Sequence, residues 1–162
     1  MDEFLNEDLL SDEAADLNEA DYTRIRKDNE KLIQNYGRSL KNKGYSEKDI
    51  YRLLSMADMY VNSYLLDNLS LSAADGIGAV DEFFTEYFPE NVIWASEDSV
   101  GNMARAIKAF YRYLLEHGMI EREEFKNLSR TIKERRELWR GASSLPDLDD
   151  PEDDELDLGD TL

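Results

Sequence analysis

The sequence predicts an all-α protein: a compact bundle of four to five helices flanked by disordered acidic tails. Apolar residues recur at helical spacings through the middle of the chain, and no segment alternates with the period of two that a strand requires. The net charge of −18 is confined to the ends. Residues 1–22 and 142–162 each carry nine acidic and no basic side chains, while residues 23–141 hold all 19 Lys and Arg beside the other 19 acids. We therefore expect one electroneutral helical domain over 23–141, with a mobile leader and tail.

Composition excludes several classes of site and location. The chain has no cysteine, so disulfides and thiolate metal sites are excluded, and a reducing cytoplasm is the expected compartment. No apolar run approaches the ~20 residues needed to span a membrane. The acidic N-terminus lacks the basic and apolar regions of a secretory signal. We expect a cytoplasmic protein without membrane partners.

Two helices with clear boundaries are predicted after the leader, which is either disordered or a short amphipathic helix that docks its Phe and Leu residues. The first helix runs from about Arg24 to Lys43 and ends at Gly44. Ser46 has the character of an N-cap for the second, which runs from about Glu47 to Leu66. The predicted inward residues are Ile25, Leu32, Ile33, Tyr36 and Leu40 in the first, and Ile50, Leu53, Leu54, Ala57, Val61, Tyr64 and Leu65, widened by Tyr51, Met59 and Tyr60, in the second.

The third predicted helix, from about Ser72 to Tyr87, is less regular. Gly76 and Gly78 weaken its first turns. Because no strand precedes this Gly-Ile-Gly and no phosphate-loop spacing follows it, we interpret it as a place of close helix packing. Pro89 ends the segment, and Trp94 in the linker after it is expected to fill the core. The predicted inward residues are Ile77, Val80, Phe83, Phe84 and Tyr87.

The best-defined helix lies between Ser96, an expected N-cap, and Gly118, an expected C-terminal stop. Its predicted apolar face comprises Val100, Met103, Ile107, Phe110, Tyr111, Leu114 and Leu115. Beside this face, Arg105, Lys108 and Arg112 form a basic stripe at spacings of three and four. A fifth helix from about Glu121 to Trp139 places Phe125, Leu128, Ile132 and Leu138 inward and seven Lys and Arg outward.

The order of these helices and caps resembles the core-binding, SAM-like helical domain of tyrosine recombinases and phage integrases. The likeness covers about residues 30–122. In that family a first helix ends in a Lys-Gly turn, a Ser-Glu-capped helix follows, and a later Ser-capped helix carries a basic residue, an aromatic pair and Leu before a Gly-hydrophobic turn. The matching residues here are Lys43, Gly44, Ser46, Glu47, Ser96, Arg105, Phe110, Tyr111, Leu114, Gly118 and Ile120.

The resemblance implies a DNA-binding module. In the family the first and central helices help to clamp one side of the duplex, and the matching basic candidates are Lys41, Lys43, Arg105, Lys108 and Arg112. We expect no catalytic domain of the kind that normally follows this module, because only about 20 residues, nine of them acidic, come after the fifth helix. His117 is the only histidine and no cluster has metal-ligand spacing, so we expect no enzyme activity, cofactor, metal or small-molecule substrate.

Charge leaves a second function open. A neutral body with two acidic ends is unlike most nucleic-acid-binding domains, which are net positive. The alternative is a protein–protein interaction adaptor whose acidic, leucine-containing tails bind a basic protein partner. One further expectation combines the two hypotheses. Acidic tails that are tethered to the body should compete with DNA for the basic residues of the body and so mask these residues.

Overall fold

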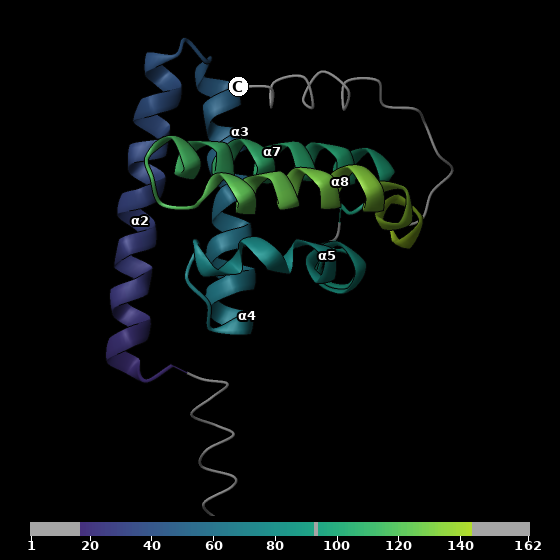
Figure 1. Ribbon diagram of the computed structural model, residues 1–162, viewed down its shortest axis with the longest axis horizontal. Helices are drawn as coiled ribbons and strands as arrows, with labels where there is room; N and C mark the ends of the chain where they lie inside the picture. Colours follow the sequence, from purple (N-terminus) through teal and green to yellow (C-terminus); the bar gives the residue numbers. More distant parts are fainter. Residues whose placement is uncertain (1–16, 93, 144–162) are drawn as a thin grey trace, which may run out of the picture.

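The computed structural model describes residues 17–92 and 94–143, and every regular element in that part of the chain is a helix. The helices pack as an all-α bundle, which confirms the predicted fold class. The acidic segments 1–16 and 144–162, where we expect the tails, lie outside the described residues. Figure 1 shows α2 (Glu19–Asn42) and α3 (Glu47–Asp58) running side by side, with α7 (Glu97–Glu116) and α8 (Arg122–Ala142) crossing them as a second pair.

Helix α2 begins five residues earlier than the sequence predicts. The side chain of Asn18 accepts a 2.8 Å hydrogen bond from the amide of Asp21, which caps the helix and draws part of the predicted leader into it. The other end is as predicted. Gly44 has a φ of +94°, a conformation that favours glycine, and Ser46 then caps α3 through a 3.1 Å bond from the amide of Asp49.

Helix α3 continues without a break into a π-helical segment, η1 (Met59–Leu66), and a short α4 (Asp67–Leu69). This helix is therefore three residues longer than predicted. Val61 and Leu65 of η1 are completely buried, so this segment crosses the centre of the bundle. Tyr51, predicted to widen the apolar face, is instead 75% exposed, because the buried face of α3 is narrow and includes Ala57 as its one fully buried residue.

The third helix changes its winding along its length. It consists of η2 (Asp75–Ala79, a 3₁₀ helix), α5 (Val80–Glu82), η3 (Phe83–Tyr87, a π-helix) and α6 (Phe88–Asn91). Pro89 lies in the first turn of α6, where its missing N–H is not needed, so the helix continues past it rather than ending there. Trp94 does not fill the core as predicted: it is 48% exposed and meets Phe88 edge-on with its ring, 5.5 Å between centroids.

Three tyrosine hydroxyls fix the start of this third helix. Tyr60 donates a 2.9 Å hydrogen bond to the carbonyl of Gly76, Tyr64 donates to that of Ala79, and Tyr111 donates to that of Ala73. Burial raises the pKa of Tyr60 and of Tyr111, so both hydroxyls keep their protons and remain donors. The close packing expected at the Gly-Ile-Gly is confirmed at Gly76, which lies against the side chain of Leu65.

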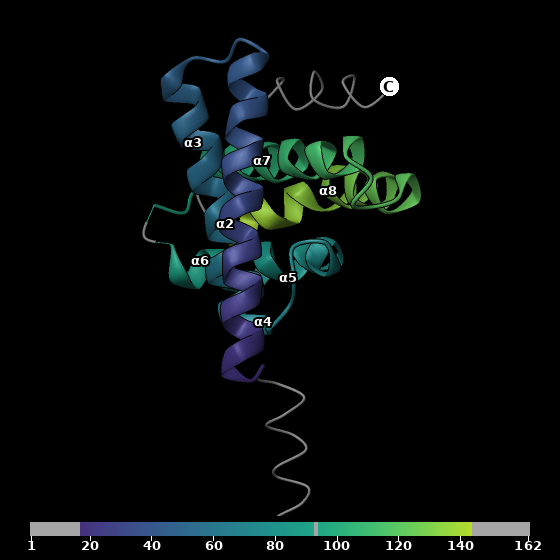
Figure 2. The same ribbon diagram turned by 90° about the vertical axis from the view of Figure 1, so that its left-hand side faces the viewer.

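Helix α8 closes the bundle through Trp139. Its fully buried ring stacks on Phe84 at 4.5 Å, and its indole N–H donates a 2.7 Å hydrogen bond to Asp81 of α5. Leu138, predicted to point inward, is 53% exposed. Adjacent residues of a helix point in different directions, and here Trp139 is the one that faces the core. Figure 2 shows the α7–α8 pair above the third helix, with α2 crossing in front.

Candidate nucleic-acid interface

Helix α7, which carries three of the predicted basic residues, is capped at both ends. Ser96 and Ser99 form the reciprocal bonds of a capping box: the Ser96 hydroxyl accepts from the Ser99 amide at 3.2 Å, and the Ser99 hydroxyl accepts from the Ser96 amide. At the other end Gly118 has a φ of +72°. The predicted apolar face is confirmed, with these side chains buried: Val100, Met103, Ile107, Phe110, Tyr111 and Leu114.

The three cations of the predicted α7 stripe have different environments. Arg105 is half-buried and donates to the amide oxygen of Asn102. The guanidinium carbon of Arg112 lies 5.7 Å from the centre of the Phe125 ring of α8, a cation–π contact. Lys108 is fully buried. It shares a side of the helix with the buried Ala104 and Tyr111, a position that spacing alone does not distinguish from the surface. In this arrangement Lys108 cannot reach a phosphate, and the accessible stripe reduces to Arg105 and Arg112.

The two candidates from the first helix lie at the end of α2, next to the end of α7. Lys41 and Lys43 are both exposed, and the Lys43 ammonium is 3.4 Å from a carboxylate oxygen of Glu116. Glu116 lies one turn beyond Arg112, and Arg105 is seven residues further back, about 10 Å along the axis. The structure therefore places four of the five predicted residues at accessible or partly accessible positions around α7.

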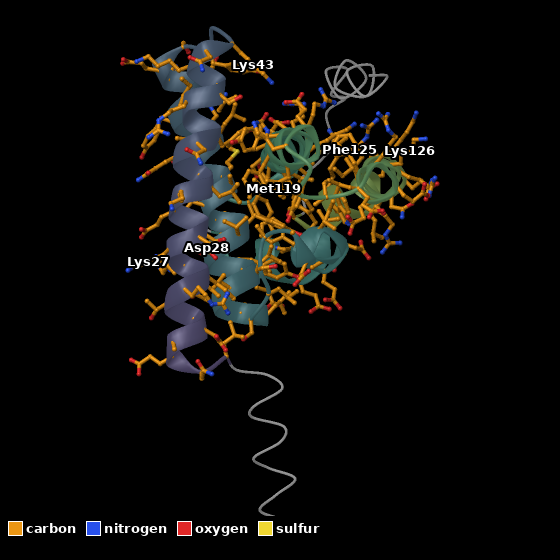
Figure 3. The ribbon with its side chains drawn as sticks, turned by 60° about the vertical axis from the view of Figure 1, so that its left-hand side comes forward. Lys27, Asp28, Lys43, Met119, Phe125 and Lys126 are labelled. Atoms are coloured by element: carbon orange, nitrogen blue, oxygen red, sulfur yellow. The ribbon has the colours of Figure 1, made fainter. Side chains whose placement is uncertain are left out.

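Sequence reasoning placed seven Lys and Arg on the outer side of α8 but did not nominate them as DNA contacts, and one of them, Arg140, is instead buried at 6% exposure. Four of the exposed cations form a row. They are spaced four, four and three residues apart and follow the outer side of the helix: Arg122, Lys126, Arg130 and Lys133. Figure 3 shows Lys126 pointing away from the bundle, on the opposite side of the molecule from Lys27 of α2. The signal that could have found them was present in the sequence, because the inward residues of this helix predict which positions face outward.

Charge is unevenly distributed along the described body. Residues 53–98, from the second half of α3 to the first two residues of α7, carry nine acidic and no basic side chains. Residues 99–143, which comprise the rest of α7 and α8, carry ten basic and six acidic side chains, and residues 17–52 carry nine basic and six acidic ones. The neutral sum of the body therefore conceals a basic face, which we define by six of the eight exposed or half-buried cations of residues 99–143: Arg105, Arg112, Arg122, Lys126, Arg130 and Lys133.

The described residues offer little else for chemistry. No group of three or more His, Asp or Glu within them could hold a metal ion. His117 ends α7, and its Nδ1 donates a 3.0 Å hydrogen bond to the carbonyl of Tyr113, a capping role. None of the helices described in the structure is both long enough and apolar enough to cross a membrane.

Comparison with known proteins yields no relative for this chain: no family model, curated protein or solved structure matches it. The likeness to recombinase core-binding domains thus stays a prediction that depends on the residues quoted above.

Proposed function

We propose that this protein is a non-catalytic helical module that binds duplex DNA through the basic face of α7 and α8. The observation that carries the proposal is the row of four exposed cations on α8, together with Arg105 and Arg112 of α7, the helix packed against α8. Phosphates are a suitable ligand for such a row, because each Lys or Arg that neutralises one releases condensed counterions. The resemblance to the core-binding domain of recombinases supports the same ligand, with Lys41 and Lys43 at the edge of the site.

The test is fluorescence anisotropy with a labelled duplex and the full chain at two salt concentrations. Four phosphate contacts predict that affinity falls roughly 100-fold between about 50 and 200 mM salt. The double variant Lys126→Glu/Lys133→Glu should lose most of the binding at the lower concentration.

A matched control changes the same charge elsewhere. Lys27 and Lys31 are exposed on α2, and Lys27 lies about 20 Å along the helix from Lys41. Figure 3 shows Lys27 pointing away from the bundle on the side remote from α8. Lys27→Glu/Lys31→Glu should therefore reduce affinity far less. Equal losses in the two variants would indicate attraction to net charge alone and would contradict a defined basic face.

A second candidate function is favoured by the charge of the end segments. Residues 142–162 combine nine acids with leucines and contain no basic residue, as expected for a ligand of a basic protein. In this function the helical body is a scaffold for an adaptor. Absence of duplex binding by the full chain at 50 mM salt, together with binding of a Lys/Arg-rich peptide, would favour the adaptor over the DNA-binding module.

A further inference from the structure

A groove between α3 and α7 combines apolar and cationic lining. Its volume is about 320 Å³. Leu53 and Met56 of α3 and the small side chains of Ala106 and Ala109 of α7 form its apolar part. Arg52 lines it from α3, and Arg105 of the basic face lines it from α7. This lining suits a ligand that presents both apolar side chains and negative charge.

We propose that the chain's own segment 144–162 docks in this groove and covers Arg105. The segment has nine acids and no Lys or Arg, and Leu156 and Leu158 alternate with acids in the run Asp-Glu-Leu-Asp-Leu. Its charge is therefore opposite to that of the two arginines, and its leucines match the apolar part of the groove. The consequence for DNA depends on the function proposed above, whereas the docking itself does not.

Other surfaces of the described body match this segment less well. One cavity of about 230 Å³ is lined by Glu82, Glu86 and Glu90 and would repel it. A cavity of about 340 Å³ beside α8 is lined by Asp75 and Glu124 and by no cation. The row of cations on α8 attracts acids, but leucine side chains need an apolar lining as well as charge. The groove between α3 and α7 offers both.

The pair between Arg52 and Asp49 does not remove the attraction. Its two atoms are 3.4 Å apart and both side chains are about half exposed, so water screens it and it contributes little. Arg52 can therefore exchange Asp49 for an acid of the docked segment. Asp49 also lines the groove, and because it repels carboxylates it favours their binding on the side near Arg105.

The segment is long enough to reach the groove from the end of α8. Nineteen residues span up to about 60 Å when extended. A folded body of this size has a radius of gyration of about 14 Å, so its whole surface is within reach. Tethering raises the effective concentration of the segment near the groove to the millimolar range, which favours docking within one chain over docking between chains.

The absence of cysteine makes a direct test possible. Thr161→Cys creates a single thiol on the full chain for a nitroxide label, and paramagnetic broadening is then measured at backbone amides. We expect strong broadening at Ala106 and Ala109 and little at Lys27 or Lys126. Salt at about 500 mM should relieve it. Uniform broadening, or broadening centred on α8, would overturn the proposal.

Variants on both sides of the contact keep the test decisive. Arg52→Glu/Arg105→Glu should abolish the broadening, whereas Lys126→Glu/Lys133→Glu should leave it. If the groove variant does not fold, Leu156→Ser/Leu158→Ser gives the same information, because it changes no residue of the helical body. A sample that mixes isotope-labelled chains with separately spin-labelled chains should show no broadening. Broadening there would place the segment on a second copy and overturn docking within the chain.

DNA binding is then measured separately on the same proteins. If the docking masks the basic face, Leu156→Ser/Leu158→Ser should raise duplex affinity several-fold at 50 mM salt. Broadening at the groove without any DNA binding would retain the docking and reject the DNA-binding function. DNA binding without broadening at the groove would retain the DNA-binding function and reject the docking.

Discussion

Gly76→Ala tests how the third helix packs against the centre of the bundle. A Cβ at position 76 would lie 2.3, 2.4 and 2.8 Å from Cδ1, Cδ2 and Cγ of Leu65, far inside van der Waals contact. Leu65 has no exposed surface into which it could move, and the carbonyl of Gly76 is held by the Tyr60 hydroxyl. Overpacking of this kind costs about 1–3 kcal/mol.

Gly78, two residues away in the same 3₁₀ helix, supplies the matched control. A Cβ there meets nothing within 4 Å, so Gly78→Ala should leave stability unchanged or raise it by about 0.4–1 kcal/mol through the unfolded chain. Urea denaturation followed by circular dichroism measures both. A free energy of unfolding that is the same for the two variants would refute the assigned contact.

The contact with Leu65 can be isolated in a double-variant cycle. Leu65→Ala alone should destabilise by about 2–5 kcal/mol, because it leaves a cavity. On that background Gly76→Ala should no longer be destabilising, since the atoms it meets have been removed. A Gly76→Ala cost that persists without Leu65 would show that the strain comes from the backbone instead.

Two further predictions concern the core and the closing contact of α8. Phe110→Ala or Leu114→Ala, both at 1% exposure, should cost about 2–5 kcal/mol in unfolding free energy, whereas the exposed Leu138→Ala should change it by about 0.5 kcal/mol or less. Burial opposes ionisation of Asp81, but hydrogen bonds from Arg135 and Trp139 outweigh it and lower its pKa. The stability from this carboxylate is therefore present above its unfolded pKa, about 4, and is lost as pH falls through the lower folded value. Asp81→Asn should lower the urea midpoint at pH 7. Between pH 5 and 3 the variant should lose less unfolding free energy than the unchanged protein. An equal loss of unfolding free energy in both proteins over this pH range would contradict the role assigned to Asp81.

The chain's local order was largely predictable from sequence. Ser46 and Ser96 cap their helices as expected, and Gly44 and Gly118 adopt the positive φ that their places required. These features depend on residues within one turn of each other, so the sequence contains all the information they need. The apolar face of α7 was predictable for the same reason, since a strong 3.6-residue period leaves one side to bury.

Only the tertiary structure decided which positions near the edge of each face are buried. Lys108 is enclosed while Leu138, Trp94 and Tyr51 are exposed, the reverse of what their side chains suggest. Their burial depends on neighbouring helices, which periodicity within one helix cannot reveal. Leu65 of the π-helical segment η1 likewise packs tightly against Gly76 of η2, a contact between two helical segments that periodicity within one helix does not show.

The candidate site, too, was determined partly by the sequence and partly by the tertiary structure. The sequence alone determined the separation of charge, with acids at both ends and all 19 basic residues between them. The tertiary structure decided that Lys108 is buried and cannot bind a phosphate. It also decided that the helix with the exposed α8 cations packs against α7, which carries Arg105 and Arg112. It also decided that Arg52 and Arg105, 53 residues apart in the chain, line one groove. Charge composition is a property of the chain, whereas a binding surface is assembled by contacts between helices that only folding brings together.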